Sequence, residues 1–113
     1  MKVAWLVLPA VLAACSSPQK EANEARDTAA SWASTGAVLA REWSRGHVTD
    51  AYTRSTARVA TEEVNKLTKL DARARDAQLR AWDALERAAE AHEPAAAAPL
   101  ARTFAALAKK SDS

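Results

Sequence analysis

Alanine is the feature that most constrains this chain, because it occupies 30 of the 113 positions while isoleucine is absent. Alanine is the residue most favourable to an α-helix, whereas sheets are enriched in β-branched and aromatic side chains. Glycine occurs only twice and proline four times, so few positions favour turns or interrupt a helix. The sequence therefore predicts an all-α fold in one small domain and argues against multi-stranded sheets and Rossmann-type nucleotide folds.

The charge and the rare reactive side chains narrow the possible functions. The formal net charge at pH 7 is +2, which is too small for electrostatic binding to nucleic acid, so no nucleic-acid partner is expected. One cysteine and two histidines provide neither a disulfide framework nor residues with the spacing of metal ligands. The sequence therefore predicts no bound metal and no cofactor.

The first 15 residues have the pattern of an export signal. Lys2 supplies a positive start, an apolar run extends over residues 3–12, and the chain turns polar at Ser16. The run is shorter than the ~20 apolar residues that a membrane-spanning helix needs, and small residues follow it as they do at a cleavage site. The alternative is an uncleaved apolar N-terminus that carries an incidental cysteine.

The segment Leu12-Ala13-Ala14-Cys15 resembles the lipobox of bacterial lipoproteins, in which Leu, a small residue, and Ala or Gly precede Cys. The resemblance implies that the Cys15 thiol receives a diacylglyceryl group and that cleavage frees the Cys15 amino group for acylation, for example with palmitate. Several acyl chains anchor better than one, because each buried CH₂ contributes roughly 0.8 kcal/mol. The expected parts are a signal peptide (1–14), a lipidated tether (15–20) and a helical domain (21–113).

The residue after the cysteine gives the expected membrane. In lipoproteins of Gram-negative bacteria, Asp at this position favours the inner membrane, and this chain has Ser16 there. The resemblance therefore implies the outer membrane, with the domain facing the periplasm. The alanine- and arginine-rich composition leaves a Gram-positive host open, and there the anchor would lie in the outer leaflet of the plasma membrane.

Three helices are expected after the signal, at about residues 19–45, 49–92 and 97–110. The first has an apolar seam with alternating steps of three and four residues. Its members are Ala22, Ala25, Ala29, Trp32, Gly36, Leu39 and Trp43. Gly46 is predicted to end this helix, Thr49 to cap the next one, and Asp50 to lie in its first turn.

The second helix is expected to be long, because no helix breaker precedes Pro94. Its apolar positions drift near residues 67–71, which leaves a bend or break around Lys69–Ala72 open, with the apolar face staying on the same side. That face comprises Val48, Tyr52, Thr56, Val59, Ala60, Glu63, Val64, Leu67, Leu70, Ala74, Ala77, Ala81, Trp82, Leu85 and Ala88.

These helices predict an antiparallel hairpin with a long second helix and a short third helix that folds back. The first helix would cover the first half of the second, and the third would cover the rest, around Trp82 and Leu85. Glu63 lies in the middle of the apolar face, where a charge is unfavourable unless it is paired. One hypothesis is a hydrogen bond from the Trp32 indole to Glu63; the alternative is a Glu63 side chain that reaches solvent.

The turn near Gly46 brings reactive and basic side chains close together in the sequence. Ser44, His47 and Asp50 could suggest a hydrolytic triad, but nothing supplies an oxyanion hole, so no catalytic residue is expected. A candidate contact tip comprises Arg41, Trp43, Arg45, His47, Tyr52 and Arg54. It would bind an anionic envelope polymer; the alternative is a solvated helix end, with Trp43 and Tyr52 in the core.

The sequence thus predicts a non-enzymatic, lipid-anchored lipoprotein that acts as a contact or structural module of the cell envelope. Its partner would be another envelope protein, a second copy of the chain, or the cell wall, in addition to the membrane that holds the lipid on Cys15. The alternative is an accessory protein or inhibitor that presents the contact tip to a periplasmic enzyme.

Overall fold

The computed structural model describes residues 17–112, with side chains up to Lys110, so the predicted signal peptide and Cys15 lie outside the described residues. The elements are α2 (Pro18–Ser44), α3 (Asp50–Asn65), α4 (Ala72–Glu90), the 3₁₀ turn η1 (Pro94–Ala96) and α5 (Ala97–Asp112). Residues 17–112 contain no strand, which confirms the all-α prediction. Because α2 begins at Pro18, the last three residues of the predicted tether are helical.

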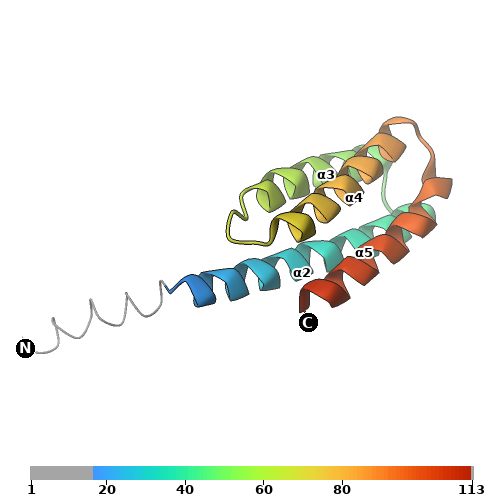
Figure 1. Ribbon diagram of the computed structural model, residues 1–113. Helices are drawn as coiled ribbons and strands as arrows, with labels where there is room; N and C mark the ends of the chain where they lie inside the picture. Colours follow the sequence, from blue (N-terminus) through green and yellow to red (C-terminus); the bar gives the residue numbers. More distant parts are fainter. Residues whose placement is uncertain (1–16, 113) are drawn as a thin grey trace, which may run out of the picture.

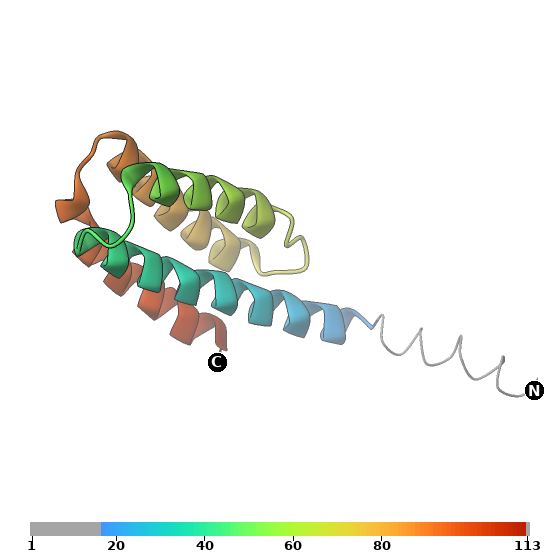
Figure 2. The ribbon, with the colours of Figure 1, turned by 180° about the vertical axis from the view of Figure 1, so that it is seen from behind.

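Successive long helices run in opposite directions and form two layers. Figures 1 and 2 show α2 beside α5 in one layer and α3 beside α4 in the other. α2 packs mainly along α5 rather than along the helix that follows it, so the expected pairing of the first two helices as a hairpin is not what the structure shows. α2 has 27 residues and is about 40 Å long at 1.5 Å per residue.

The prediction of one continuous helix over residues 49–92 is wrong, the break left open around Lys69–Ala72 is present, and residues 17–112 contain four long helices instead of three. α3 ends at Asn65, and Asp71 caps α4 by accepting a hydrogen bond from the Ala74 N–H at 3.2 Å. Leu70, in the turn between them, is buried against Ala25 and Ala29 of α2. Folding α4 back along α3 gives the apolar faces of both helices a partner, which a single straight helix of this length would not.

The turn between α2 and α3 follows the sequence signals. Gly46 adopts a left-handed conformation with φ 75°, its N–H donates to Trp43 O, and the next N–H donates to Glu42 O. These two bonds satisfy carbonyls at the end of α2. Thr49 Oγ1 accepts a hydrogen bond from the Tyr52 N–H at 3.0 Å. The predicted stop at Gly46 and the predicted cap at Thr49 are both confirmed.

The core has an aromatic centre surrounded by alanine. Trp82 is fully buried, and its ring centroid lies 4.6 Å from that of Phe104 and 6.3 Å from that of Trp32. Gly36 lies directly against the Phe104 ring. The predicted α2 seam is confirmed, since all its members are buried or half-buried. The expected cover of Trp82 and Leu85 by the last helix is also present, through Phe104.

The buried face of α3 differs from the prediction by about one position. Tyr52 and Val59, expected in the core, are 57% and 50% exposed. Ala60 and Val64 are buried as predicted, whereas Thr53 and Ala57 are buried in place of Tyr52 and Val59. Small side chains allow the neighbouring helices to approach closely, and the Thr53 hydroxyl is satisfied by Thr49 O at 2.9 Å, so packing overrides the hydrophobicity of the larger residues.

A buried glutamine, rather than Glu63, connects the two layers. Gln78 is 1% exposed; its Nε2 donates to Ala29 O at 2.8 Å, and its Oε1 accepts from Trp82 Nε1 at 3.3 Å. Glu63 pairs with Lys66 at 3.6 Å with its side chain 45% exposed. The hypothesis of a hydrogen bond between Trp32 and Glu63 is therefore wrong.

The described core is made entirely of residues between Ala25 and Phe104. The bundle therefore closes its own hydrophobic core, and a chain that begins at Ser16 retains every described core contact. Among residues 17–112, no helix combines the length and the hydrophobicity that crossing a bilayer requires.

Candidate functional site

The bundle has two chemically different ends. One end contains the turn between α2 and α3 and the C-terminus of α4, and it carries the predicted contact tip. The opposite end contains the start of α2, the turn between α3 and α4, and the last turns of α5 (Figure 1). This second end is called the anchor-side end, because α2 begins there at Pro18, three positions after Cys15, the residue at which the sequence predicts a lipid anchor.

A hydrogen-bonded cluster fixes the tip end by joining three helices. Asp50 Oδ1, at the start of α3, accepts from Trp43 Nε1 of α2 at 2.7 Å. Asp50 Oδ2 lies 2.5 Å from Nδ1 of His92, which follows α4. The hydrogen bond with His92 lowers the pKa of Asp50, and the Trp43 hydrogen bond lowers this pKa further. His92 has a left-handed φ of 56° and closes the end of α4 as Gly46 closes the end of α2.

A second cluster lies on the surface of the same turn. His47 Nδ1 lies 2.5 Å from Glu42 Oε2, and Arg45 lies 3.7 Å from the other oxygen of the same carboxylate. The hydrogen bond with His47 lowers the pKa of Glu42, and the positive charges of Arg45 and Arg41 lower this pKa further. The Glu42 carboxylate therefore neutralises part of the positive charge that the sequence predicted for the tip.

The structure does not assemble a triad from Ser44, His47 and Asp50. The Ser44 hydroxyl donates to Arg41 O at 2.7 Å, and His47 pairs with Glu42. Asp50 is occupied by two other partners. Among the described residues, no group of three or more His, Cys, Asp or Glu side chains is placed to hold a metal ion.

The members of the predicted contact tip divide between surface and core. Arg41, Arg45 and His47 are exposed, and Tyr52 is exposed as well. Trp43 is only 2% exposed, so its ring belongs to the core as the alternative prediction held. Arg54 is half-buried, and its Nε is enclosed without a hydrogen-bond partner among the described residues.

An apolar surface lies beside the tip. Tyr52 and Val38 are two of the three large hydrophobic residues that are exposed in the described part of the chain. Together with the half-buried Val48 they line a depression of about 460 Å³ between α2 and α3. Tyr52 is therefore part of the tip surface, because its side chain is exposed and lines this depression. It is not part of the buried face of the helix, where the apolar spacing had placed it.

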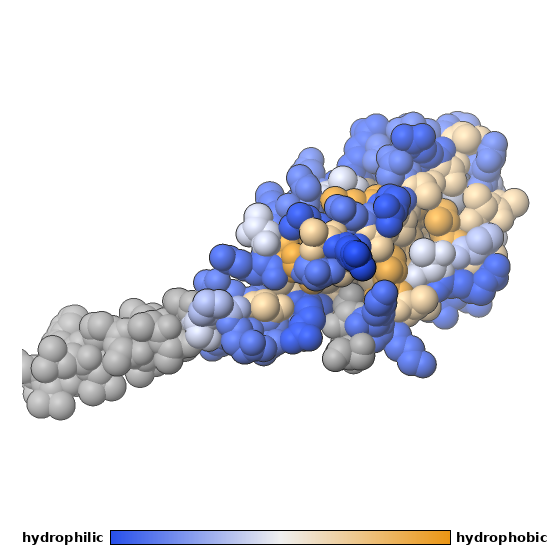
Figure 3. All heavy atoms as spheres, viewed as in Figure 1, coloured by the Kyte–Doolittle hydropathy of each residue, from blue (hydrophilic) through white to orange (hydrophobic). Residues whose placement is uncertain are grey.

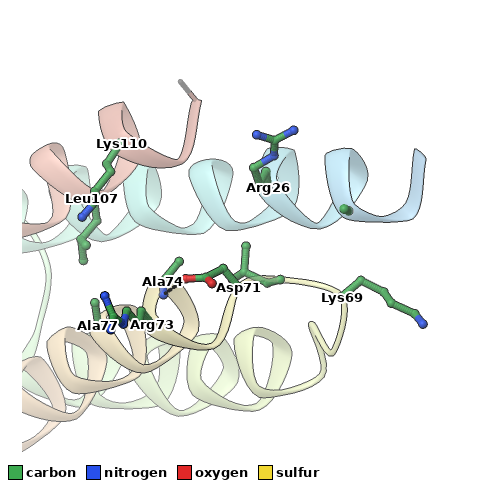
Figure 4. Close-up of a pocket in the computed structure, with 10 residues that line it drawn as sticks. Arg26, Lys69, Asp71, Arg73, Ala74, Ala77, Leu107 and Lys110 are labelled. Carbon is green, nitrogen blue, oxygen red and sulfur yellow. Dashed lines mark hydrogen bonds between the residues drawn. The ribbon is translucent and has the colours of Figure 1, made fainter. Parts of the chain in front are cut away.

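A hollow at the anchor-side end was not predicted. It is a groove of about 560 Å³ where α2, α4, α5 and the turn between α3 and α4 meet. It is called the anchor-side groove, and its lining consists of Ala22, Arg26, Lys69, Leu70, Asp71, Arg73, Ala74, Ala77, Leu107 and Lys110 (Figure 4). Figure 3 shows hydrophobic residues in the middle of one face of the bundle, surrounded by hydrophilic residues.

The sequence did not reveal this groove because a continuous second helix would keep its residues apart. Only the turn at residues 66–71 brings Lys69 and Arg73 back over α2 and beside the end of α5. The available signal was Asp71, a residue type that favours the N-cap, at the point where the apolar spacing drifts. A helix start at Ala72 would have placed these side chains together.

Neither protein-family models, nor curated proteins, nor solved structures yielded a match to the chain.

Proposed function

We propose that the chain is a non-enzymatic lipoprotein of the bacterial outer membrane, held by lipid on Cys15, whose bundle is a contact module for a protein of the envelope. The single observation that supports the anchor is the lipobox-like segment Leu12-Ala13-Ala14-Cys15. Its cysteine stands three positions before the first residue of α2 at Pro18. A short tether would hold the anchor-side end near the membrane surface.

The direction of α2 supports the choice of the tip end as the contact surface. α2 extends for 27 residues, or about 40 Å at 1.5 Å per residue, from the anchor-side end to the tip. An anchored bundle that stands upright therefore presents Arg45 and His47 at its far end, where a partner outside the membrane is reached first.

The exposed apolar surface favours a protein partner over a charged polymer. Val38 and Tyr52 are 50% and 57% exposed beside the tip, and aromatic residues with arginine are enriched at protein interfaces. Glu42 already pairs with His47 and Arg45, which weakens attraction to an anionic polymer. An experiment has to distinguish this partner from three others: a second copy of the chain, the cell wall, and a periplasmic enzyme regulated by the tip.

The test is photo-crosslinking in intact cells with the full-length, lipidated protein. A photoreactive phenylalanine derivative replaces Tyr52 in one variant and Arg80, which is exposed on α4, in a matched control. We expect one protein adduct of defined mass from position 52 and none of that mass from position 80. An adduct at twice the mass of the chain would identify a second copy, and an adduct with glycan would identify the cell wall. Absence of a position-specific adduct contradicts the proposal of a tip contact.

A further inference from the structure

The floor of the anchor-side groove is apolar and is formed by small side chains. Leu70, Ala74 and Ala77 lie along one side, with Ala22 from α2 and Leu107 from α5 completing it. In Figure 4 Leu107 points from α5 toward α4, where Ala74 and Ala77 face it. Ala74 and Ala77 lie three positions apart in α4, about 4.5 Å at helical rise. Alanine at these positions leaves open the space that larger residues would fill.

The rim of the same groove is mainly cationic. Arg73 and Lys110 lie on opposite sides of the gap between α4 and α5, while the ends of Arg26 and Lys69 point away from it in this view (Figure 4). Lys69 lies 3.8 Å from Glu21. Arg73 has no ion pair or side-chain hydrogen bond with any residue in the range 17–112. The one carboxylate in the lining is Asp71, which caps α4.

A cleft with an apolar floor and a few charged groups at its edge is the usual form of a small-molecule site, and its volume of about 560 Å³ lies within the usual range of about 300–1,000 Å³. We propose that the anchor-side groove binds one anionic amphiphile with a single alkyl chain, such as a fatty acid. The chain lies on the alanine floor, and the carboxylate is held by Arg73. Guanidinium groups bind carboxylates with charge-assisted hydrogen bonds.

This inference does not depend on the lipid anchor or on the contact tip, so it can be tested on the lipid-free chain from Ser16 to Ser113, which retains the whole described core. Titration calorimetry at neutral pH compares three probes with the same dodecyl tail below their micelle concentrations: dodecanoate, dodecyltrimethylammonium and dodecyl maltoside. We expect saturable 1:1 binding of dodecanoate and affinities at least about tenfold weaker for the cationic and neutral probes.

Four variants separate the groove from general effects of charge. Arg73→Glu is expected to weaken dodecanoate binding by about tenfold or more, since it removes a charge-assisted bond and adds repulsion. Arg80→Glu changes the net charge equally on the same helix outside the groove and should leave the affinity unchanged. Asp71→Asn keeps a capping side chain and should strengthen binding, while Ala77→Leu fills the floor and should abolish it.

Circular dichroism of each variant establishes that the bundle is folded at the titration temperature. Equal affinities for the three probes, non-saturable uptake, or equal losses in Arg73→Glu and Arg80→Glu would overturn the proposal, because each would show association with the protein surface in general. A failure of dodecanoate to bind at all would overturn it as well, without bearing on the anchor at Cys15.

Discussion

Gly36 of α2 and Phe104 of α5 are packed so closely that a Cβ atom at position 36 would lie 2.5 Å from Phe104 Cδ1. The Phe104 ring cannot move aside easily, because it is fully buried and lies against Trp82. The backbone at Gly36 is helical and needs no special conformation. The close approach of the two helices is therefore the reason that this position requires glycine. This contact sets the distance between α2 and α5 in the middle of the bundle.

Gly36→Ala should destabilise the bundle although alanine is the better helix former. The gain in helix propensity is about 1 kcal/mol, whereas overpacking a rigid core costs about 1–3 kcal/mol, and the 2.5 Å approach favours the upper part of that range. We expect a net loss on the order of 1–2 kcal/mol in urea unfolding followed by circular dichroism. Ser34→Ala, on the exposed side of the same helix, is the control and should not destabilise. A Gly36→Ala protein as stable as the parent would show that α5 is not packed as described.

Gln78→Leu should reveal the polar link between the layers. The substitution replaces the amide with an apolar side chain of similar size and leaves the buried Trp82 N–H without its acceptor, at a cost of about 1–3 kcal/mol. It also removes the bond from Gln78 to Ala29 O, which is 2.8 Å long. Gln19→Leu, on the exposed first turn of α2, is the control. Equal unfolding midpoints for the two variants would mean that the Gln78 amide does not stabilise the bundle.

Protonation of Asp50 at acidic pH should lower the stability of the bundle. Its pKa is lower in the folded chain than its ordinary value of 3.8, so the folded state binds this proton more weakly than the unfolded state does. The stabilisation is full above the ordinary pKa and is lost as the pH falls through the lower, folded-state pKa.

Urea midpoints measured from about pH 6 to about pH 2 should therefore fall more steeply for the parent than for Asp50→Asn, which can still accept from Trp43. Glu62→Gln, an exposed carboxylate on the same helix, controls for the loss of one charge. Parallel curves for the parent and Asp50→Asn would contradict the assigned role of the cluster with Trp43 and His92.

Deleting residues 95–113 should expose the aromatic centre. Phe104 and Ala101 leave with α5, so one side of the buried Trp82 ring meets water. We expect a red shift of tryptophan emission and a lower melting temperature in the shortened chain. An unchanged spectrum together with an unchanged melting temperature would exclude α5 from the core.

The sequence predicted those elements that depend on local chemistry. Alanine content and the scarcity of breakers gave the all-α class, the seam of α2 gave its buried face, and the ends near Gly46 and Thr49 follow from backbone hydrogen bonds to neighbouring residues. Each of these depends on residues within a few positions, where propensity and capping are the main forces.

The elements that were missed depend on long-range packing. The break before Asp71, which the sequence left open without deciding it, depends on Leu70 packing against α2. The outward position of Tyr52 depends on the burial of Ala57 and Ala60 on the other face of α3. Spacing along one helix contains no information about which partner covers it. The anchor-side groove, which consists of three separated segments, was invisible for the same reason.

The most direct test of the central claim, anchoring through Cys15, is the intact mass of the protein purified from membranes of its own host. We predict the mass of residues 15–113 plus a diacylglyceryl group, with one more acyl chain where the amino group is modified. Cys15→Ser should yield no such species and should leave a precursor or a protein that washes off the membrane. A membrane-derived protein with the unmodified mass of residues 1–113, or the same membrane retention for Cys15→Ser, would contradict the account.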